Sequence, residues 1–428
     1  MVAFLLVLVV VLAVLGGVHW YVWRRLVRDV TVAGGLPRRL GTVAVVALPL
    51  FSLAALTSSR AGAPFWFQQV VAWPGFLWLA LLLYVTLALV VGEAVRPVLR
   101  ARLERRAKAA VPAEVAAPVS VPEPVSVPDS VPDAVTTASP AEAAPPAAEV
   151  PVDVSRRLFV SRVVGGSAAA VALGTVGYGA YGVLRGPRVK RVTVPLAKLS
   201  RAAHGYRIAV VSDIHLGPIL GRAHSQRIVD AINSTQPDLI AIVGDLVDGT
   251  VENLGPAAEP LARLRARHGS YFVTGNHEYF SGADAWVDHV RELGLRPLRN
   301  ERVEIAAGFD LAGVDDVAGE SEGRGPDFGR ALGDRDRARA AVLLAHQPIV
   351  IHDAVRNGVD LQLSGHTHGG QLWPGNYLAE LANPTVAGLE QYGDTQLYVS
   401  RGAGAWGPPV RVGAPSDITI VELASKQA

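Results

Sequence analysis

The chain has 428 residues, half of them hydrophobic, and a formal net charge of only +2 at pH 7. Its length allows more than one domain, and the near-neutral charge argues against a nucleic-acid-binding surface. Because there is no cysteine, disulfides, thiolate metal sites and cysteine nucleophiles are excluded. Any transition-metal site must therefore use His, Asp, Asn or Glu.

The region 1–109 carries the excess of hydrophobic residues and predicts three transmembrane helices, at 2–22, 40–56 and 70–91. About 20 apolar residues are enough to cross a bilayer. A cleaved signal peptide is the alternative for the first segment. It fits less well, because no basic residue precedes the apolar run and bulky aromatic residues occupy the place of a cleavage site.

Basic residues predict the orientation of these helices. The loop between the second and third helices carries only Arg60, whereas the other flanks are rich in arginine. The basic residues that follow the first and third helices are Arg24, Arg25, Arg28, Arg38, Arg39, Arg96, Arg100, Arg102, Arg105, Arg106 and Lys108. By the positive-inside rule, the N-terminus is outside and the third helix ends inside.

The region 110–154 has the composition of a linker. It is rich in Pro, Ala, Val and Ser, and its only charges are acidic. Proline at this density opposes both helix and sheet, so an extended tether is expected.

The region 155–187 has two interpretations. Its apolar stretch is long enough for a fourth transmembrane helix with small-residue packing faces. The sequence Ser155-Arg156-Arg157-Leu158-Phe159-Val160 also resembles a twin-arginine export signal, which would make the twin-arginine translocase a partner. Both interpretations carry the chain outward and predict a multi-pass membrane protein with an extracytoplasmic C-terminal domain. The basic residues that follow at 185–191 favour retention inside.

The region 188–428 predicts an α/β domain. Apolar runs of four to six residues alternate with helical patterns such as 225–234 and 283–293.

Five polar clusters each follow an apolar run that is typical of a buried strand. They are Asp213-Ile-His215, Gly244-Asp245, Gly275-Asn276-His277-Glu278, Ala345-His346 and Gly365-His366-Thr367-His368. Strand ends at one edge of a sheet can place their side chains in one cleft. These residue types together are the ligands of a two-metal hydrolytic centre.

Each cluster alone is weak evidence for a metal site, and only their combination is strong. Asp213 and His215 are two apart on an extended segment, so both side chains can reach one ion. Asp245 has two carboxylate oxygens and can bridge two ions. We expect His277 to give a proton and not to ligate. Asp248 is expected to cap a turn, and Glu278 either to orient His277 or to cap a helix.

The series DIHLG, GDLVDG, GNHEYF, AHQP and SGHTHGGQ resembles the motif set of calcineurin-like metallophosphoesterases over about residues 200–424. The tail YVSRGAGAWGPPVRVGAPSDITIVEL resembles their membrane-anchored bacterial branch. The resemblance implies a four-layer αββα metallophosphoesterase sandwich, here preceded by the transmembrane region. It assigns Asp213, His215 and His368 to one metal and Asn276, His346 and His366 to the other, with Asp245 bridging. The implied ions are two of Mn, Fe or Zn.

The resemblance also implies a mechanism and a substrate class. A hydroxide between the ions would attack phosphorus, and His277 would protonate the leaving group. Protein phosphatases of this superfamily carry arginines where this chain has Gly249 and Thr274. A phosphodiester, or a lipid or cell-envelope precursor, is therefore favoured over a phosphoprotein. The alternative is a metal-stabilised binding or scaffold module attached to a membrane sensor. It is disfavoured because a structural site needs no proton donor.

Overall fold

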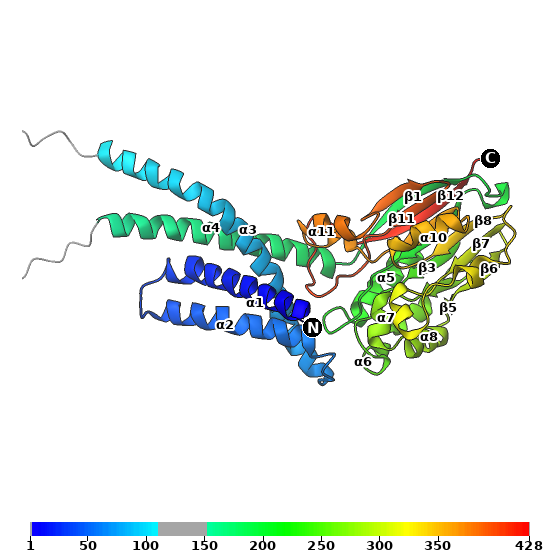
Figure 1. Cartoon of the computed structure of the whole chain (residues 1–428), viewed down its shortest axis with the longest axis horizontal. Coiled ribbons are helices and arrows are strands. Elements are labelled where there is room, and N and C mark those ends of the chain that lie inside the picture. Colours follow the sequence, from blue (N-terminus) through cyan, green and yellow to red (C-terminus); the bar gives the residue numbers. More distant parts are fainter. Residues whose placement is uncertain (1, 110–151, 428) are drawn as a thin grey trace, which may run out of the picture. The chain divides into compact units, whose positions relative to one another are not determined.

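The computed structural model describes residues 2–109 and 152–427 (Figure 1). These residues form two compact units, one built from 2–39, 86–109 and 152–169 and the other from 40–85 and 170–427. The expected linker at 110–154 lies outside the described residues, apart from 152–154, which begin a helix.

Four long helices account for most of the N-terminal half. They are α1 (Val2–Trp23, continued by a π-helical turn at Arg24–Arg28), α2 (Leu36–Thr57), α3 (Phe65–Ala109) and α4 (Val152–Leu184). Each contains a stretch long and apolar enough to cross a membrane. The four expected helices are therefore present, and α3 continues without a break through the basic residues that follow its apolar part. Their number of crossings and their orientation stay predictions.

Polar contacts and close approaches hold these helices within each unit. In the first unit, Glu93 pairs with Arg25 at 2.8 Å and accepts a hydrogen bond from the Tyr21 hydroxyl at 3.2 Å. In the second unit, the Ser52 hydroxyl of α2 donates to the carbonyl oxygen of Gly75 in α3 at 2.8 Å. A Cβ at Gly75 would overlap the α2 backbone, so the two helices cross where the side chain is smallest.

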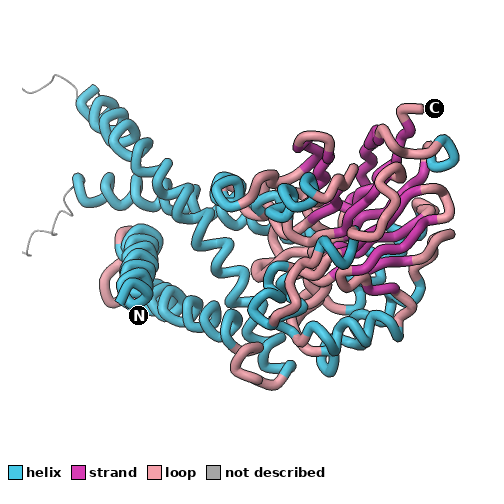
Figure 2. Tube along the Cα trace, turned by 45° about the vertical axis from the view of Figure 1, so that its right-hand side comes forward, coloured by secondary structure: helices cyan, strands magenta, loops and turns pink. Residues whose placement is uncertain are grey.

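The C-terminal domain contains two six-stranded sheets (Figure 2). The first has the order β1 (Arg188–Leu196), β12 (Asp417–Ser425), β2 (Tyr206–Val211), β3 (Leu239–Val243), β4 (Ser270–Val273) and β5 (Arg296–Pro297). The second has the order β10 (Gly388–Tyr392), β11 (Thr395–Val399), β9 (Leu361–Ser364), β8 (Ala340–Leu344), β7 (Phe309–Gly313) and β6 (Glu301–Ile305). All five apolar runs expected to be strands are confirmed as strands of these sheets.

Alternating side chains give the domain four layers. In β2, Ile208 and Val210 belong to a core that draws on both sheets, whereas Ala209 and Val211 face helices outside the first sheet. Those helices are α5 (Arg222–Ser234), α6 (Val251–Ala258) and α8 (Ala283–Glu292). The second sheet is covered by α9 (Phe328–Leu332) and α10 (Ile351–Arg356). Since successive strand residues point to opposite faces, the buried alternation produces the αββα sandwich that was expected.

Parallel strands bring the polar clusters to one edge. The strands β2, β3 and β4 are mutually parallel, and so are β8 and β9 in the facing sheet. The carboxyl ends of parallel strands lie at the same edge of a sheet. The polar clusters that follow these five strands therefore meet at one end of the sandwich.

Candidate metal centre

Three overlapping groups of side chains have ligand atoms within 4.8 Å of one another. They are Asp213, His215 and His368, then Asp245, His346 and His366, and then His215, Asp245 and His277. Asn276 joins the second group, because its Oδ1 lies 3.0 Å from Nδ1 of His366. The structure thus brings together all eight side chains expected at the site. Their roles as ligands are taken up below as a proposal.

Five of these residues have a left-handed backbone. Their φ angles are 52° for Asp213, 48° for His215, 52° for Asp245, 73° for His366 and 53° for His368. Residues with a side chain rarely adopt this conformation, and it concentrates at functional sites. Here it turns the chain sharply after β2, β3 and β9.

His346 shows that the site needs a cation. Its Nδ1 lies 2.8 Å from the carbonyl oxygen of Val243, and since a carbonyl only accepts, the proton is on Nδ1. The lone pair on Nε2 then faces Oδ2 of Asp245 at 3.1 Å, and Nε2 has no hydrogen-bond partner among the described residues. Two buried electron-pair donors repel each other unless a proton or a metal ion lies between them. Although burial opposes it, Asp245 raises the pKa of His346 well above its usual range, so a proton meets this need until a metal replaces it. The donor set therefore fits a metal.

His215 has the same arrangement. Its Nδ1 donates to Oδ1 of Asp248 at 2.9 Å, which directs the lone pair of Nε2 into the site. There Nε2 lies 3.0 Å from Nε2 of His368 and 3.8 Å from Oδ2 of Asp245. A ligating histidine is commonly oriented by a carboxylate on its other nitrogen.

The other two histidines, His366 and His368, differ from His215 and His346 because their surroundings favour the neutral form that ligates a metal. Burial lowers the pKa of His366 to about 4, and burial together with His215 and Arg411 lowers the pKa of His368 well below its usual range. Arg411 also holds His368 in place, because its guanidinium donates to the His368 carbonyl oxygen at 2.9 Å and to Nδ1 at 3.0 Å. Asp213 accepts from the backbone N–H of His366 through both oxygens, at 3.0 and 3.1 Å.

Asp248 is a site residue that the sequence interpretation missed. It was expected to cap a turn, and this prediction is wrong, because its Oδ1 accepts from His215 and lies 2.7 Å from Nδ1 of His277. Burial alone would raise the pKa of Asp248, but His215 and His277 lower it to about 2. Burial likewise opposes the charged form of His215, yet Asp248 raises the pKa of His215 to about 9. The signal in the sequence was the second acid of Gly-Asp-Leu-Val-Asp, at 244–248.

Glu278 caps a helix and ties two strand ends together. Its carboxylate accepts from the backbone N–H groups of Gly275 at 2.6 Å, Asp245 at 3.0 Å and Leu246 at 2.8 Å. Burial and the neighbouring Asp245 raise the pKa of Glu278 to about 7. Of its two expected roles, capping is the one observed. A Cβ at Gly275 would overlap Asp245, so glycine is required where these two strand ends touch.

Comparisons with known proteins agree with this geometry. A family model described as calcineurin-like phosphoesterase matches residues 206–370. A transmembrane protein with metallophosphoesterase domain from Danio rerio is 39% identical over 264 residues, covering 59% of this chain and 60% of the relative. A metallophosphoesterase of Helicobacter pylori is 38% identical over 260 residues, covering 59% of this chain and 69% of the relative. The metallophosphoesterase YkuE of Bacillus subtilis is 30% identical over 286 residues, covering 64% of this chain and 98% of the relative.

Among solved structures, a dimetal phosphatase from Danio rerio is similar with a TM-score of 0.33 at 12% identity, covering 50% of this chain and 91% of that one. The chain belongs to the calcineurin-like phosphoesterase family. Its site takes two divalent metal ions, whose identity the His, Asp and Asn donors leave open. The chain spans 60% and 57% of the length of its Danio rerio and Bos taurus relatives.

Proposed function

We propose that the protein is a membrane-associated, metal-dependent phosphoesterase that hydrolyses a phosphodiester or a lipid- or envelope-linked phosphate. The observation that carries the proposal is the convergence of buried imidazole nitrogens and carboxylate oxygens from five strand ends. One of these approaches joins His346 Nε2 and Asp245 Oδ2 at 3.1 Å. Buried donors arranged in this way serve metal-assisted hydrolysis better than a structural role.

Each side chain has a distinct part in this proposal. Asp213, His215 and His368 would hold one ion, and Asn276, His346 and His366 the other, with the Asp245 carboxylate between them. Two bound divalent ions would supply Lewis-acid activation of the phosphoryl group and of water. His277 would protonate the departing oxygen, since it is partly exposed beside the site and its Nδ1 is held by Asp248 at 2.7 Å.

The surroundings of His277 support a substrate with an apolar leaving group. Its ring lies 5.6 Å from that of Phe280 and 6.0 Å from that of Trp406. Phe280 is 64% exposed and Trp406 54% exposed, so both rings are available to a ligand. The positions at which protein phosphatases carry arginine are occupied by Gly249 and Thr274. An aromatic rim without these two guanidinium groups suits a lipid-like diester better than a phosphoprotein.

Membrane association is supported by the four apolar helices and by the names of the transmembrane relatives. We further propose that four helices cross the membrane and that the catalytic domain lies outside the cytoplasm. Alkaline phosphatase fused at the C-terminus should then be active and a fused green fluorescent protein dark; the reverse result places the domain inside. If 155–160 acts as a twin-arginine signal, changing Arg156 and Arg157 to lysine should abolish export.

The hydrolytic proposal is tested with the full chain purified in detergent. With Mn²⁺ it should cleave bis(p-nitrophenyl) phosphate faster than p-nitrophenyl phosphate. Asp245→Asn should lose nearly all activity, and His277→Ala should lose about 100-fold, the usual contribution of a general acid. Asp288→Asn, which removes an exposed carboxylate of α8, is the matched control. Undiminished activity of Asp245→Asn or His277→Ala would exclude the assigned roles, and absence of metal-dependent hydrolysis would exclude the function.

A further inference from the structure

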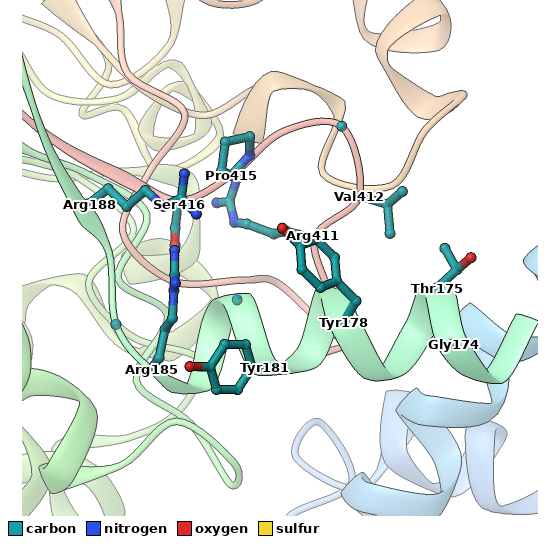
Figure 3. Close-up of a pocket in the computed structure, with 13 residues that line it drawn as sticks. Gly174, Thr175, Tyr178, Tyr181, Arg185, Arg188, Arg411, Val412, Pro415 and Ser416 are labelled. Atoms are coloured by element: carbon teal, nitrogen blue, oxygen red, sulfur yellow. The ribbon is translucent and has the colours of Figure 1, made fainter.

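A pocket of about 470 Å³ lies between the C-terminal end of α4 and the segment 411–416, within the second unit and apart from the metal ligands (Figure 3). Its volume is in the range of pockets that bind small molecules. From α4 the lining includes Gly174, Tyr178 and Tyr181, and Arg185 follows the last helical residue, Leu184. The three helical positions are separated by four and three residues, so they share one face of the helix.

The two walls of the pocket are fixed to each other. A Cβ at Gly179 would lie 2.7 Å from Cγ1 of Val410 and 2.8 Å from the carbonyl oxygen of Arg411, so only glycine lets this segment approach α4 so closely. Nearby, the fully buried Val183 of α4 packs with Leu220 and Ala405 of the domain. The two walls are therefore held together by close packing within this unit, which fixes the shape of the pocket.

The lining joins two free cations to apolar and hydroxyl-bearing side chains. Arg185 and Arg188 are exposed, and neither forms a salt bridge with a carboxylate among the described residues. The guanidinium of Arg185 lies 5.7 Å from the Tyr181 ring centroid, close enough for a cation–π contact. Figure 3 shows Tyr178 reaching from α4 toward the segment that carries Arg411, with Tyr181 near Arg185. Such a lining suits an anionic group attached to an apolar body.

The position of the pocket at the end of the apolar stretch of α4 indicates the kind of ligand. The stretch of α4 that is able to cross a membrane ends at Leu184, and Arg185 follows directly. Tyr178 is 75% and Tyr181 is 61% exposed, and tyrosines with this exposure at a helix end are typical of the membrane–water interface. Phospholipid headgroups lie at that level, with their acyl chains alongside the apolar part of α4.

We propose that this pocket binds the phosphate of an anionic phospholipid, with Arg185 and Arg188 contacting the headgroup and the tyrosines contacting its glycerol and upper acyl chains. The inference rests on the membrane association in the proposed function but not on the hydrolytic reaction. It also links the membrane to the metal centre, because Arg411 lines the pocket and hydrogen-bonds His368. Lipid would stabilise the segment that supports this histidine.

The test is native mass spectrometry of the full chain in a mild detergent, titrated with phosphatidylglycerol or with phosphatidylcholine of the same acyl chains. One phosphatidylglycerol should bind about tenfold more tightly than phosphatidylcholine. The double variant Arg185→Gln/Arg188→Gln should bind it about 25-fold more weakly, since each arginine near an anionic headgroup contributes about fivefold. The double variant Arg191→Gln/Arg201→Gln removes the same charge from exposed positions outside the pocket and should bind normally.

Three results would overturn the proposal. They are equal affinity for the two lipids, unchanged binding by Arg185→Gln/Arg188→Gln, and equal losses in both double variants. Complete displacement of the lipid by millimolar inorganic phosphate would instead identify a site for the free ion. Arg185→Lys/Arg188→Lys keeps both charges and should retain most of the binding, which separates lost recognition from lost folding. Because lipid binding is read without turnover, it can succeed or fail independently of phosphodiester hydrolysis.

Discussion

Replacing Asp248 by asparagine should weaken metal binding and slow hydrolysis while the fold is retained. In the native protein Oδ1 of Asp248 accepts from His215 Nδ1 at 2.9 Å and lies 2.7 Å from His277 Nδ1. Asparagine keeps the shape but removes the charge, and its amide nitrogen can only donate. His215 would lose the anion that orients its ring, and His277 the partner that positions it.

The magnitude follows from the pKa shift and from the role of similar carboxylates. Burial opposes ionisation, yet the two histidines lower the pKa of Asp248 from 3.8 to about 2, which corresponds to about 2 kcal/mol. A depressed pKa contributes stability above pH 3.8 that is lost as the pH falls through about 2. The metal-free variant should therefore be less stable than wild type at pH 7, and the difference should vanish near pH 2. Loss of a carboxylate behind a ligating histidine typically costs about 10- to 100-fold in metal affinity or activity.

The assay measures the Mn²⁺ affinity of the full chain by competition with a chelator, and the rate of bis(p-nitrophenyl) phosphate cleavage at saturating Mn²⁺. Asp288→Asn removes an exposed carboxylate of α8 and should leave both quantities unchanged. Asp248→Asn combined with His277→Ala should slow the reaction by less than the product of the two single effects, because the residues act as a pair. Affinity and rate within about twofold of wild type would refute the positioning role of Asp248. If Asp288→Asn lost as much affinity and rate as Asp248→Asn, the effect would come from the net charge of the protein and not from the contacts of Asp248.

Three other outcomes are expected. Gly275→Ala should destabilise the protein by about 1–3 kcal/mol in thermal or denaturant unfolding, because its Cβ would overlap Asp245; unchanged stability would show that the strand ends can separate. Burial opposes the charged form of His215, but Asp248 raises the pKa of His215 to about 9. Metal binding to this nitrogen must therefore release a proton, so the affinity for Mn²⁺ should rise with pH up to about 9. Calorimetry in buffers of different ionisation enthalpy measures that proton, and an affinity independent of pH contradicts the coupling. Trp406→Ala should lower kcat/KM about tenfold for a long-chain diester and little for methyl p-nitrophenyl phosphate, whereas equal effects on both would argue against contact between Trp406 and the apolar part of the substrate.

Local patterns in the sequence were enough to predict the four apolar helices, the five strands that precede the site and the residue types that gather there. The apolar runs before Asp213, Asp245, Asn276, His346 and His366 are each short and bounded by turn residues, and all five are strands. The ligand types could be predicted because few side chains bind transition metals and this chain has no cysteine. The four apolar helices were predictable from length and composition alone, since only one physical requirement, about 20 apolar residues, defines them.

Contacts between distant segments were decided only by the tertiary structure. Asp248 was misassigned because a carboxylate three residues after Asp245 has many local uses, and only the packing of β2, β3 and α7 (Asn276–Ser281) brings it to His215 and His277. The pocket at α4 likewise joins residues more than 200 positions apart. Hydrophobic periodicity and turn residues act over a few positions, so the helices and strands that they define can be predicted from a single sequence. Strand order, histidine tautomers and the meeting of α4 with the segment 411–416 depend on the burial of the whole domain, which no local pattern encodes.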